Sequence, residues 1–166
     1  MSSTAKLTGP SQILEAMPEH PALKAISSLG PQALSGAIFD RSELTLTVDS
    51  GLLLAAASAL RQAGYNFFED MTAVDRLPAS PRFQLSYHLL SLELKERIRL
   101  RVFINEANPS VESITSLWPG ANYYEREVFD LFGIRFHGHP NLRRILMPDD
   151  WQGHPLRKDY PVEGYR

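Results

Sequence analysis

The sequence predicts an α+β domain, in which a mixed or antiparallel sheet is flanked by helices, with an extended, proline-rich C-terminal strap. The evidence is apolar alternation at the period of a strand, apolar stripes at helical spacing that end at glycine, and proline recurring towards the C-terminus. We expect three parts: a poorly ordered N-terminus over residues 1–18, the α+β domain over residues 19–133, and an extended docking strap over residues 134–166.

The composition is that of a globular protein that can bury a core. Of the 166 residues, 43% are hydrophobic and 22% are charged, which favours one domain. A net charge of -2 argues against nonspecific binding to nucleic acid, which needs a basic surface. No apolar run approaches the roughly 20 residues that span a bilayer, and no secretory signal begins the chain. We therefore expect a cytoplasmic location and membrane association only through partners.

The first third of the chain predicts a helix and a β-hairpin. Apolar residues at helical spacing indicate a short helix over residues 22–29, and Gly30 follows its end. Residues 43–48 alternate between apolar and polar side chains, which is the period of a strand with one buried face. Residues 37–39 can pair with that strand across a turn at residues 40–42.

A helix and two strands follow the hairpin. Asp49 or Ser50 can cap the helix, whose apolar stripe runs to about Ala63. Alternation then predicts strands over residues 83–89 and 98–104. The apolar phase shifts at the end of the first of these strands, which predicts a β-bulge there.

The helix predicted over residues 121–132 carries a carboxylate in an unfavourable place. No glycine or proline interrupts the helix, and Gly133 follows it. Glu125 falls on its apolar flank, where an ionised carboxylate destabilises the fold unless a positive group compensates it. We therefore expect Glu125 to pair with an arginine, and Glu125→Ala to destabilise more than Glu125→Gln. The candidate partners are Arg143, Arg144 and Arg157.

The strap is expected to run extended against a surface. Proline recurs too often in it for a helix or a central strand to persist. Large apolar side chains lie between the prolines, and a solvated loop does not normally carry them. If the surface belongs to a partner, the strap is mobile in the free protein, and Trp151 is the first anchor to test.

Ordered motifs in the C-terminal half carry a family resemblance. They include YERE at 124–127, DLFGI at 130–134, LRRIL at 142–146 and GHPLRKDYP at 153–161. Together these motifs closely resemble the C subunit of the proton-pumping NADH:quinone oxidoreductase, respiratory complex I. Weaker similarity extends upstream to about Phe67.

The resemblance implies a cofactor-free structural subunit of the hydrophilic arm, supporting electron transfer from NADH to quinone coupled to proton translocation. It implies no catalytic activity of the isolated chain and a peripheral place at the cytoplasmic face of the inner membrane. The implied neighbours are the D subunit, which helps to form the quinone cavity, the B subunit, with one iron-sulfur cluster, and the I subunit, with two. Flavin and clusters then belong to partner subunits; the chain has no cysteine and no dinucleotide or Walker motif.

The residues expected to bind partners or to form ion pairs lie in the 121–132 helix and in the strap. We favour a structural ion network over catalysis for them. The positions are Glu125, Arg126, Glu127, Asp130, Arg143, Arg144, Trp151, His154, Arg157, Lys158, Asp159 and Tyr160.

Three alternatives remain open from the sequence. An equivalent subunit of a membrane-bound hydrogenase or of another quinone-reducing dehydrogenase would keep the role and change the electron donor. A free-standing small hydrolase would need His88, Asp75 and Ser86, but the chain has no G-x-S-x-G elbow. A metal enzyme would need His137 and His139, but two imidazoles without a third ligand make a poor zinc site.

Overall fold

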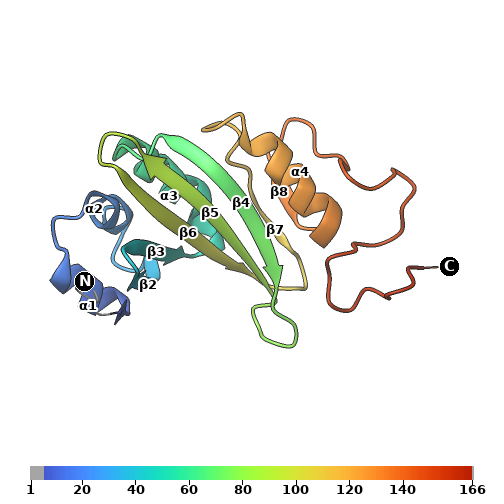
Figure 1. Cartoon of the computed structure of the whole chain (residues 1–166), viewed down its shortest axis with the longest axis horizontal. Helices are drawn as coiled ribbons and strands as arrows, with labels where there is room; N and C mark the ends of the chain where they lie inside the picture. Colours follow the sequence, from blue (N-terminus) through green and yellow to red (C-terminus); the bar gives the residue numbers. More distant parts are fainter. Residues whose placement is uncertain (1–5, 166) are drawn as a thin grey trace. The chain divides into compact units, whose positions relative to one another are not determined.

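The structure is a computed structural model that describes residues 6–165 of the chain (Figure 1). Six strands form a mixed sheet in the order β1-β2-β3-β6-β5-β4, and two further strands, β7 and β8, pair in parallel. The predicted α+β class is confirmed. In chain order the elements are β1 Leu7–Thr8, α1 Pro10–Ala16, α2 Pro21–Ser27, β2 Leu34–Asp40, β3 Glu43–Val48, η1 Ser50–Leu52, α3 Leu53–Gln62, β4 Phe67–Asp75, β5 Phe83–Ser91, β6 Glu96–Ile104, β7 Ser110–Glu112, α4 Ala121–Phe132 and β8 Arg135–His137.

The chain divides into two compact units. The first comprises Met1–Glu69 and Ser86–Val102, and the second comprises Asp70–Leu85 and Phe103–Arg166. Strands β4, β5 and β6 therefore contribute residues to both units. This division differs from the boundary expected at residue 133, because the strap groups with α4 in the second unit.

The first unit contains the predicted hairpin and the predicted α3 helix. Strands β2 and β3 pair antiparallel, and the turn between them places Arg41 and Ser42 at positive φ. The Asp49 side chain accepts a hydrogen bond from the backbone N–H of Gly51, which caps the short η1 turn before α3. The apolar stripe of α3 is buried, as its spacing predicts, and Leu60 has no exposed surface.

The N-terminal residues differ from the expectation of poor order. Within the described part, β1 pairs with β2 and places Leu7 opposite Phe39. Helix α1 begins with Pro10, a residue that favours the first turn of a helix, and buries Ile13 completely. The expectation is wrong for residues 6–18, because β1 is paired in the sheet and α1 packs through the buried Ile13. Residues 1–5 lie outside the described residues.

Two details of the sheet also differ. Strand β4 is not predicted, because its buried positions hold Met71, Ala73 and the carboxylate Asp75 rather than an apolar series. The bulge expected near Leu89 is wrong, because buried residues occupy every second position from one end of β5 to the other. The leucines that shift the apolar phase beyond β5 lie exposed in the following turn.

The second unit contains α4, β7, β8 and the strap. Helix α4 ends as predicted at Gly133, whose φ of 72° is left-handed. After β8 the chain continues to residue 165 without a helix or strand, as the irregular segment coloured orange to red in Figure 1. The beginning of the strap nevertheless belongs to the core, because Ile134 and Phe136 are buried.

Candidate functional site

Asp130 of α4 organises the first part of the strap. Its carboxylate is completely buried, and Oδ2 accepts hydrogen bonds from the backbone N–H groups of Ile145, Leu146 and Met147 at 2.8–3.0 Å. Oδ1 accepts from Arg144 Nη1 at 2.6 Å. Burial alone raises the pKa of this carboxyl, but the four donors outweigh burial and lower it. Asp130 is therefore an ionised centre around which irregular backbone is ordered.

Two arginines satisfy carbonyl groups that have no partner in a helix or sheet. Arg144 Nη2 donates to the backbone oxygens of Trp151 and Gly153 at 2.9 and 3.0 Å. Arg126 of α4 donates to the backbone oxygens of Arg143 and Arg144 at 3.1 and 3.0 Å. Charged donors of this kind make stronger hydrogen bonds than neutral ones, so they hold the strap in one conformation.

The strap also caps the C-terminal end of α4. His154 Nδ1 donates to the Asp130 backbone oxygen at 2.9 Å, and Arg157 Nε donates to the Phe132 oxygen at 2.7 Å. These are carbonyls that the last turn of a helix leaves unpaired. A Cβ at Gly133 would lie 2.5 Å from His154 Nε2, so both the left-handed backbone and the close approach require glycine.

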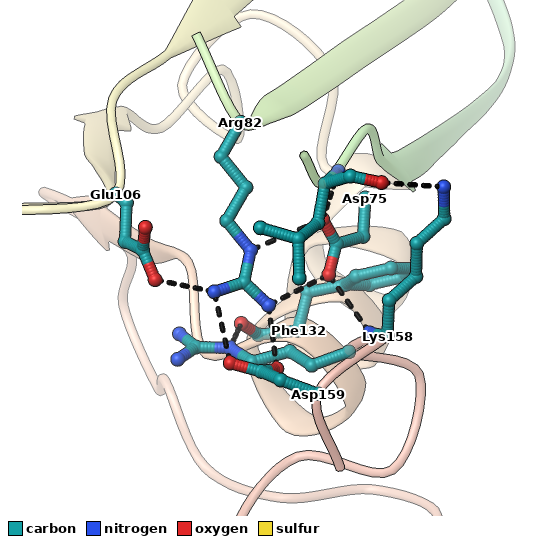
Figure 2. Close-up of polar contacts among 8 residues, drawn as sticks. Asp75, Arg82, Glu106, Phe132, Lys158 and Asp159 are labelled. Carbon is teal, nitrogen blue, oxygen red and sulfur yellow. Dashed lines mark hydrogen bonds and ion pairs between the residues drawn. The ribbon is translucent and has the colours of Figure 1, made fainter. Parts of the chain in front are cut away.

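A second ion cluster joins the far part of the strap to residues 75–82 (Figure 2). Arg82 Nη2 donates to Asp75 at 2.8 Å and to Asp159 at 2.5 Å, and Arg82 Nη1 donates to Glu106. The Arg82 and Asp75 side chains are only 3% and 1% exposed. The backbone N–H of Lys158 donates to Asp75 at 2.9 Å. Consecutive strap residues thus bind opposite partners of one buried ion pair.

The Asp75 carboxyl is held ionised within this cluster. Burial by itself raises its pKa, but the hydrogen bonds from Arg82 and from the N–H groups of Leu77 and Lys158 hold the pKa well below its usual range. No sequence pattern singles out Arg82 or Glu106 as a site residue, because Arg82 and its partner Asp159 lie 77 positions apart in the chain. Asp75 enters the sequence analysis only as a member of the hydrolase alternative.

Glu125 is not paired with an arginine, so the predicted pairing is wrong. Its carboxylate is completely buried, as predicted, but Oε2 accepts from Ser113 Oγ at 2.6 Å and Oε1 from the Ile114 N–H at 2.8 Å. Arg144 binds Asp130 instead, because the strap covers the helix face that the periodicity assigns to solvent. Burial outweighs the two hydrogen bonds at Glu125 and raises its pKa to about 7.

We expect Glu125→Gln to reduce the pH dependence of stability. Since the folded pKa is raised, the stabilising effect of a protonated Glu125 is complete below the ordinary pKa of about 4.5 and is lost as the pH rises through about 7. Glutamine keeps an oxygen acceptor for Ile114 without the charge. Melting temperatures from about pH 5 to about pH 8 should fall for wild type and change less for the variant. The exposed Glu127→Gln is the control, and parallel wild-type and Glu125→Gln curves would contradict the expectation.

We expect Asp130→Asn to lower the free energy of unfolding by about 2 kcal/mol. The amide keeps one acceptor oxygen but directs its NH₂ group towards donors, so buried N–H groups and Arg144 lose a partner. Urea unfolding monitored by circular dichroism measures the change, with the exposed Asp149→Asn as control. A loss no greater than that of the control would show that the Asp130 contacts do not stabilise the strap.

Large apolar side chains remain exposed around this polar framework. Tyr123, Tyr124, Ile145 and Leu146 line a shallow groove together with Glu127. Trp151 is 40% exposed, so it does not occupy a pocket of its own on this chain. Exposed aromatic and aliphatic groups beside ordered backbone are typical of surfaces that partners cover.

The predicted site residues fall into groups. Arg126, Asp130, Arg144 and His154 meet at α4, whereas Lys158 and Asp159 belong to the second cluster. Arg143 contributes only its carbonyl oxygen to these contacts, and Arg157 lies at the end of α4. Tyr160 donates to the Gln152 oxygen at 3.3 Å, and Trp151 and Glu127 are exposed.

Residues 6–165 meet the requirements of neither a metal-ligand cluster nor a membrane-spanning helix. In that part of the chain, no three or more histidine, cysteine or acidic side chains are placed to bind a metal ion together. His139 Nε2 lies 3.2 Å from the Asn122 backbone oxygen, and His137 is exposed. None of the described helices combines the length and apolarity required to cross a bilayer.

Comparison with known proteins decides the family. The model of the family described as respiratory-chain NADH dehydrogenase, 30 kDa subunit, matches residues 46–166. The chain belongs to this family. The C subunit of the NADH-quinone oxidoreductase of Roseiflexus sp. (strain RS-1) is 48% identical over 143 residues, covering 84% of this chain and 82% of that protein. The corresponding C subunit of Roseiflexus castenholzii is 52% identical over 135 residues, with 80% and 78% coverage. The resemblance inferred from the C-terminal motifs is thus confirmed.

Two solved structures share the fold of this chain. A trypsin-resistant fragment (1-134) of Nqo5 has a TM-score of 0.63 and 31% identity, covering 78% of this chain and 98% of that chain. A chain of the membrane-bound sulfane sulfur reductase, an archaeal respiratory membrane complex, has a TM-score of 0.70, 84% coverage of both chains and 23% identity. The second likeness shows the shared fold alone.

Proposed function

We propose that this chain is a cofactor-free structural subunit of the hydrophilic arm of NADH:quinone oxidoreductase. Members of its family are subunits of this complex, so other subunits are its partners. The observation that carries the structural role is the strap: buried ions fix its backbone, while large apolar side chains beyond β8, such as Leu146 and Trp151, are exposed. A surface of this kind can bind neighbouring subunits. Electron transfer from NADH to quinone, coupled to proton translocation, is then an activity of the whole complex.

The partners proposed are the D, B and I subunits, which the sequence resemblance implies. A chain without cysteine cannot supply thiolate ligands for iron-sulfur clusters, which supports placing the clusters, together with the flavin, in partner subunits. The proposed location is peripheral, at the cytoplasmic face of the inner membrane, with contact to the membrane through the complex.

A related role in another respiratory complex is the second candidate. The fold likeness to a chain of the membrane-bound sulfane sulfur reductase keeps this candidate open. The scaffolding role would then be the same, and the electron donor of the assembly would differ.

Affinity purification from membranes tests the proposal. A tagged copy is expressed in a strain that lacks the native subunit, and the proteins that co-purify are identified by mass spectrometry. We expect the D, B and I subunits to co-purify and NADH:quinone activity to return. Purification as a free small protein would refute the proposed role. Recovery with hydrogenase-type or sulfur-reductase-type subunits, without NADH:quinone activity, would select the second candidate.

The isolated chain gives an independent test of the cofactor assignment. We expect its absorption spectrum to show no visible chromophore and elemental analysis to show no stoichiometric metal. A bound flavin, or a metal at one ion per chain, would contradict the cofactor-free role.

A further inference from the structure

Aromatic rings and carboxylates line a hollow near the end of the strap. Its walls include the rings of Trp151, Tyr160 and Tyr165 and the side chains of Asp150 and Glu163. An adjoining hollow shares Trp151, Tyr160 and Glu163 with it. Neither lysine nor arginine occurs among the described residues that line either hollow. The surface is therefore aromatic and acidic, without a described basic group in its walls.

Close packing on a glycine fixes two of these rings. Tyr160 and Tyr165 meet edge to face, with their ring centroids 5.3 Å apart and an interplanar angle of 86°. A Cβ at Gly153 would lie 2.7 Å from a ring carbon of Tyr165 and 2.8 Å from one of Tyr160. Gly153 also has a left-handed φ of 78°, so the position requires glycine for both reasons.

The ion pair of α4 orders backbone that adjoins the hollow. Arg144, which binds the buried Asp130, donates to the backbone oxygens of Trp151 and Gly153. These two residues carry the indole wall and the backbone on which both tyrosines pack. The walls are thus positioned before any partner binds, which lowers the entropy lost on binding.

The chemistry of the walls selects a cation with a flat, partly apolar surface. The faces of aromatic rings carry negative electrostatic potential, and carboxylates complement a positive charge directly. Trp151 and Tyr165 are 40% and 58% exposed, so a ligand can reach them. A guanidinium group stacks on indole and also donates to carboxylates, which a compact ammonium does less well.

We propose that this hollow binds an arginine side chain presented by a neighbouring subunit of the complex. The proposal rests on the proposed function and specifies the chemistry of one contact within it. Trp151 then acts as a wall of a receptor site, rather than as an anchor inserted into the partner.

Binding of a small cationic probe tests the hollow on the full-length chain. The chain has two tryptophans, and the buried Trp118 serves as an internal reference for Trp151 in indole N–H NMR spectra. N-acetyl-arginine amide is expected to shift the Trp151 signal saturably, and N-acetyl-norleucine amide is expected to shift it at least several-fold less. Asp150→Asn/Glu163→Gln should weaken the response to the arginine probe several-fold while the Trp118 signal stays in place. Equal responses to both probes, or an unchanged response in the double variant, would overturn the proposal.

The last residue of the sequence is itself an arginine, so it has its own control. Arg166 lies outside the described residues. Without a probe, Arg166→Ala should leave the Trp151 signal where it is. If this substitution moves the signal as far as the saturating arginine probe does, the chain fills its own hollow and the partner assignment is overturned.

Membranes test the contact in the assembled complex. Asp150→Asn/Glu163→Gln is compared with Glu93→Gln/Glu112→Gln, which removes two exposed acidic groups outside the hollow. We expect several-fold less of the first variant to stay in the complex after a wash at raised salt, and the second to behave like wild type. If wild type itself is absent from the complex, the proposed function fails. If wild type and both variants are retained equally, only the arginine contact fails.

Discussion

Replacing Arg82 with methionine is expected to lower the free energy of unfolding by about 3 to 5 kcal/mol. The substitution leaves the Asp75 carboxylate, which is 1% exposed, without its positive partner. Removing one member of a buried ion pair destabilises strongly because the remaining charge is neither solvated nor compensated. Methionine fills much of the space of the arginine stem, so the loss reports the charge rather than a cavity.

Urea unfolding of Arg82→Met and of a matched exposed variant measures this effect. Arg97 pairs with Glu69 but is half-exposed, so Arg97→Met is expected to cost less than about 1 kcal/mol. Adding Asp75→Asn to Arg82→Met should recover part of the loss, because it removes the uncompensated charge. Equal losses of unfolding free energy in the Arg82→Met and Arg97→Met variants would show that burial does not strengthen the contribution of the Arg82 ion pair to stability.

Acid should reduce the difference between wild type and Arg82→Met. The pKa of Asp75 is depressed in the folded protein, so the contribution of the ionised group is present above its ordinary pKa of about 4 and is lost as the pH falls through the folded pKa. The contribution of the buried Glu125 to stability changes with pH in the opposite direction, since its stabilising effect is lost as the pH rises. Unfolding of both proteins at acid and at neutral pH separates the two contributions.

Ending the chain after Pro140 is expected to leave a folded protein that no longer enters the complex. This cut keeps β8, whose Phe136 is buried, and removes Asp130's strap contacts together with the exposed aromatic groups. Asp130 then becomes accessible to water, so its charge does not remain buried and unpaired. A trypsin-resistant fragment (1-134) of the related Nqo5 has the same fold over 78% of this chain, which supports a folded truncation product.

The stability of the truncated protein depends on where the chain is cut. The sequence by itself favours a cut after Gly133, on the premise that the strap contributes little to the core. The structure contradicts that premise, because the cut would remove Ile134 and Phe136 from the core and β8 from its pair with β7. We therefore expect the shorter product to lose several kcal/mol more than the longer one.

Circular dichroism of both truncated proteins measures folding, and NADH:quinone activity of membranes from a strain lacking the native subunit measures incorporation. The full-length chain in the same strain is the control. Full membrane activity with the cut after Pro140 would show that the rest of the strap holds no partner. Loss of fold in that product would show that the later strap residues belong to the core.

Local patterns determined much of the fold. The hairpin, the stripe of α3 and the end of α4 at Gly133 follow from spacing and from glycine, because a helix or a hairpin repeats over neighbouring residues. The ordered motifs of the C-terminal half likewise indicated the family, which the match over residues 46–166 confirms. Strand β4 could not be predicted in this way, since a buried carboxylate, Asp75, stands where the alternation requires an apolar residue.

Only the tertiary structure decided which charges meet. Periodicity correctly places Glu125 on a buried face, yet Arg144 binds Asp130, which the same periodicity assigns to solvent. The strap covers that side of α4, and the sequence of the helix alone does not indicate that another segment will bury it. Arg82 and Asp159 are likewise joined across 77 positions of the chain. Helix and strand periods depend on adjacent residues, whereas the burial and pairing of an ion depend on which distant surfaces the fold brings together.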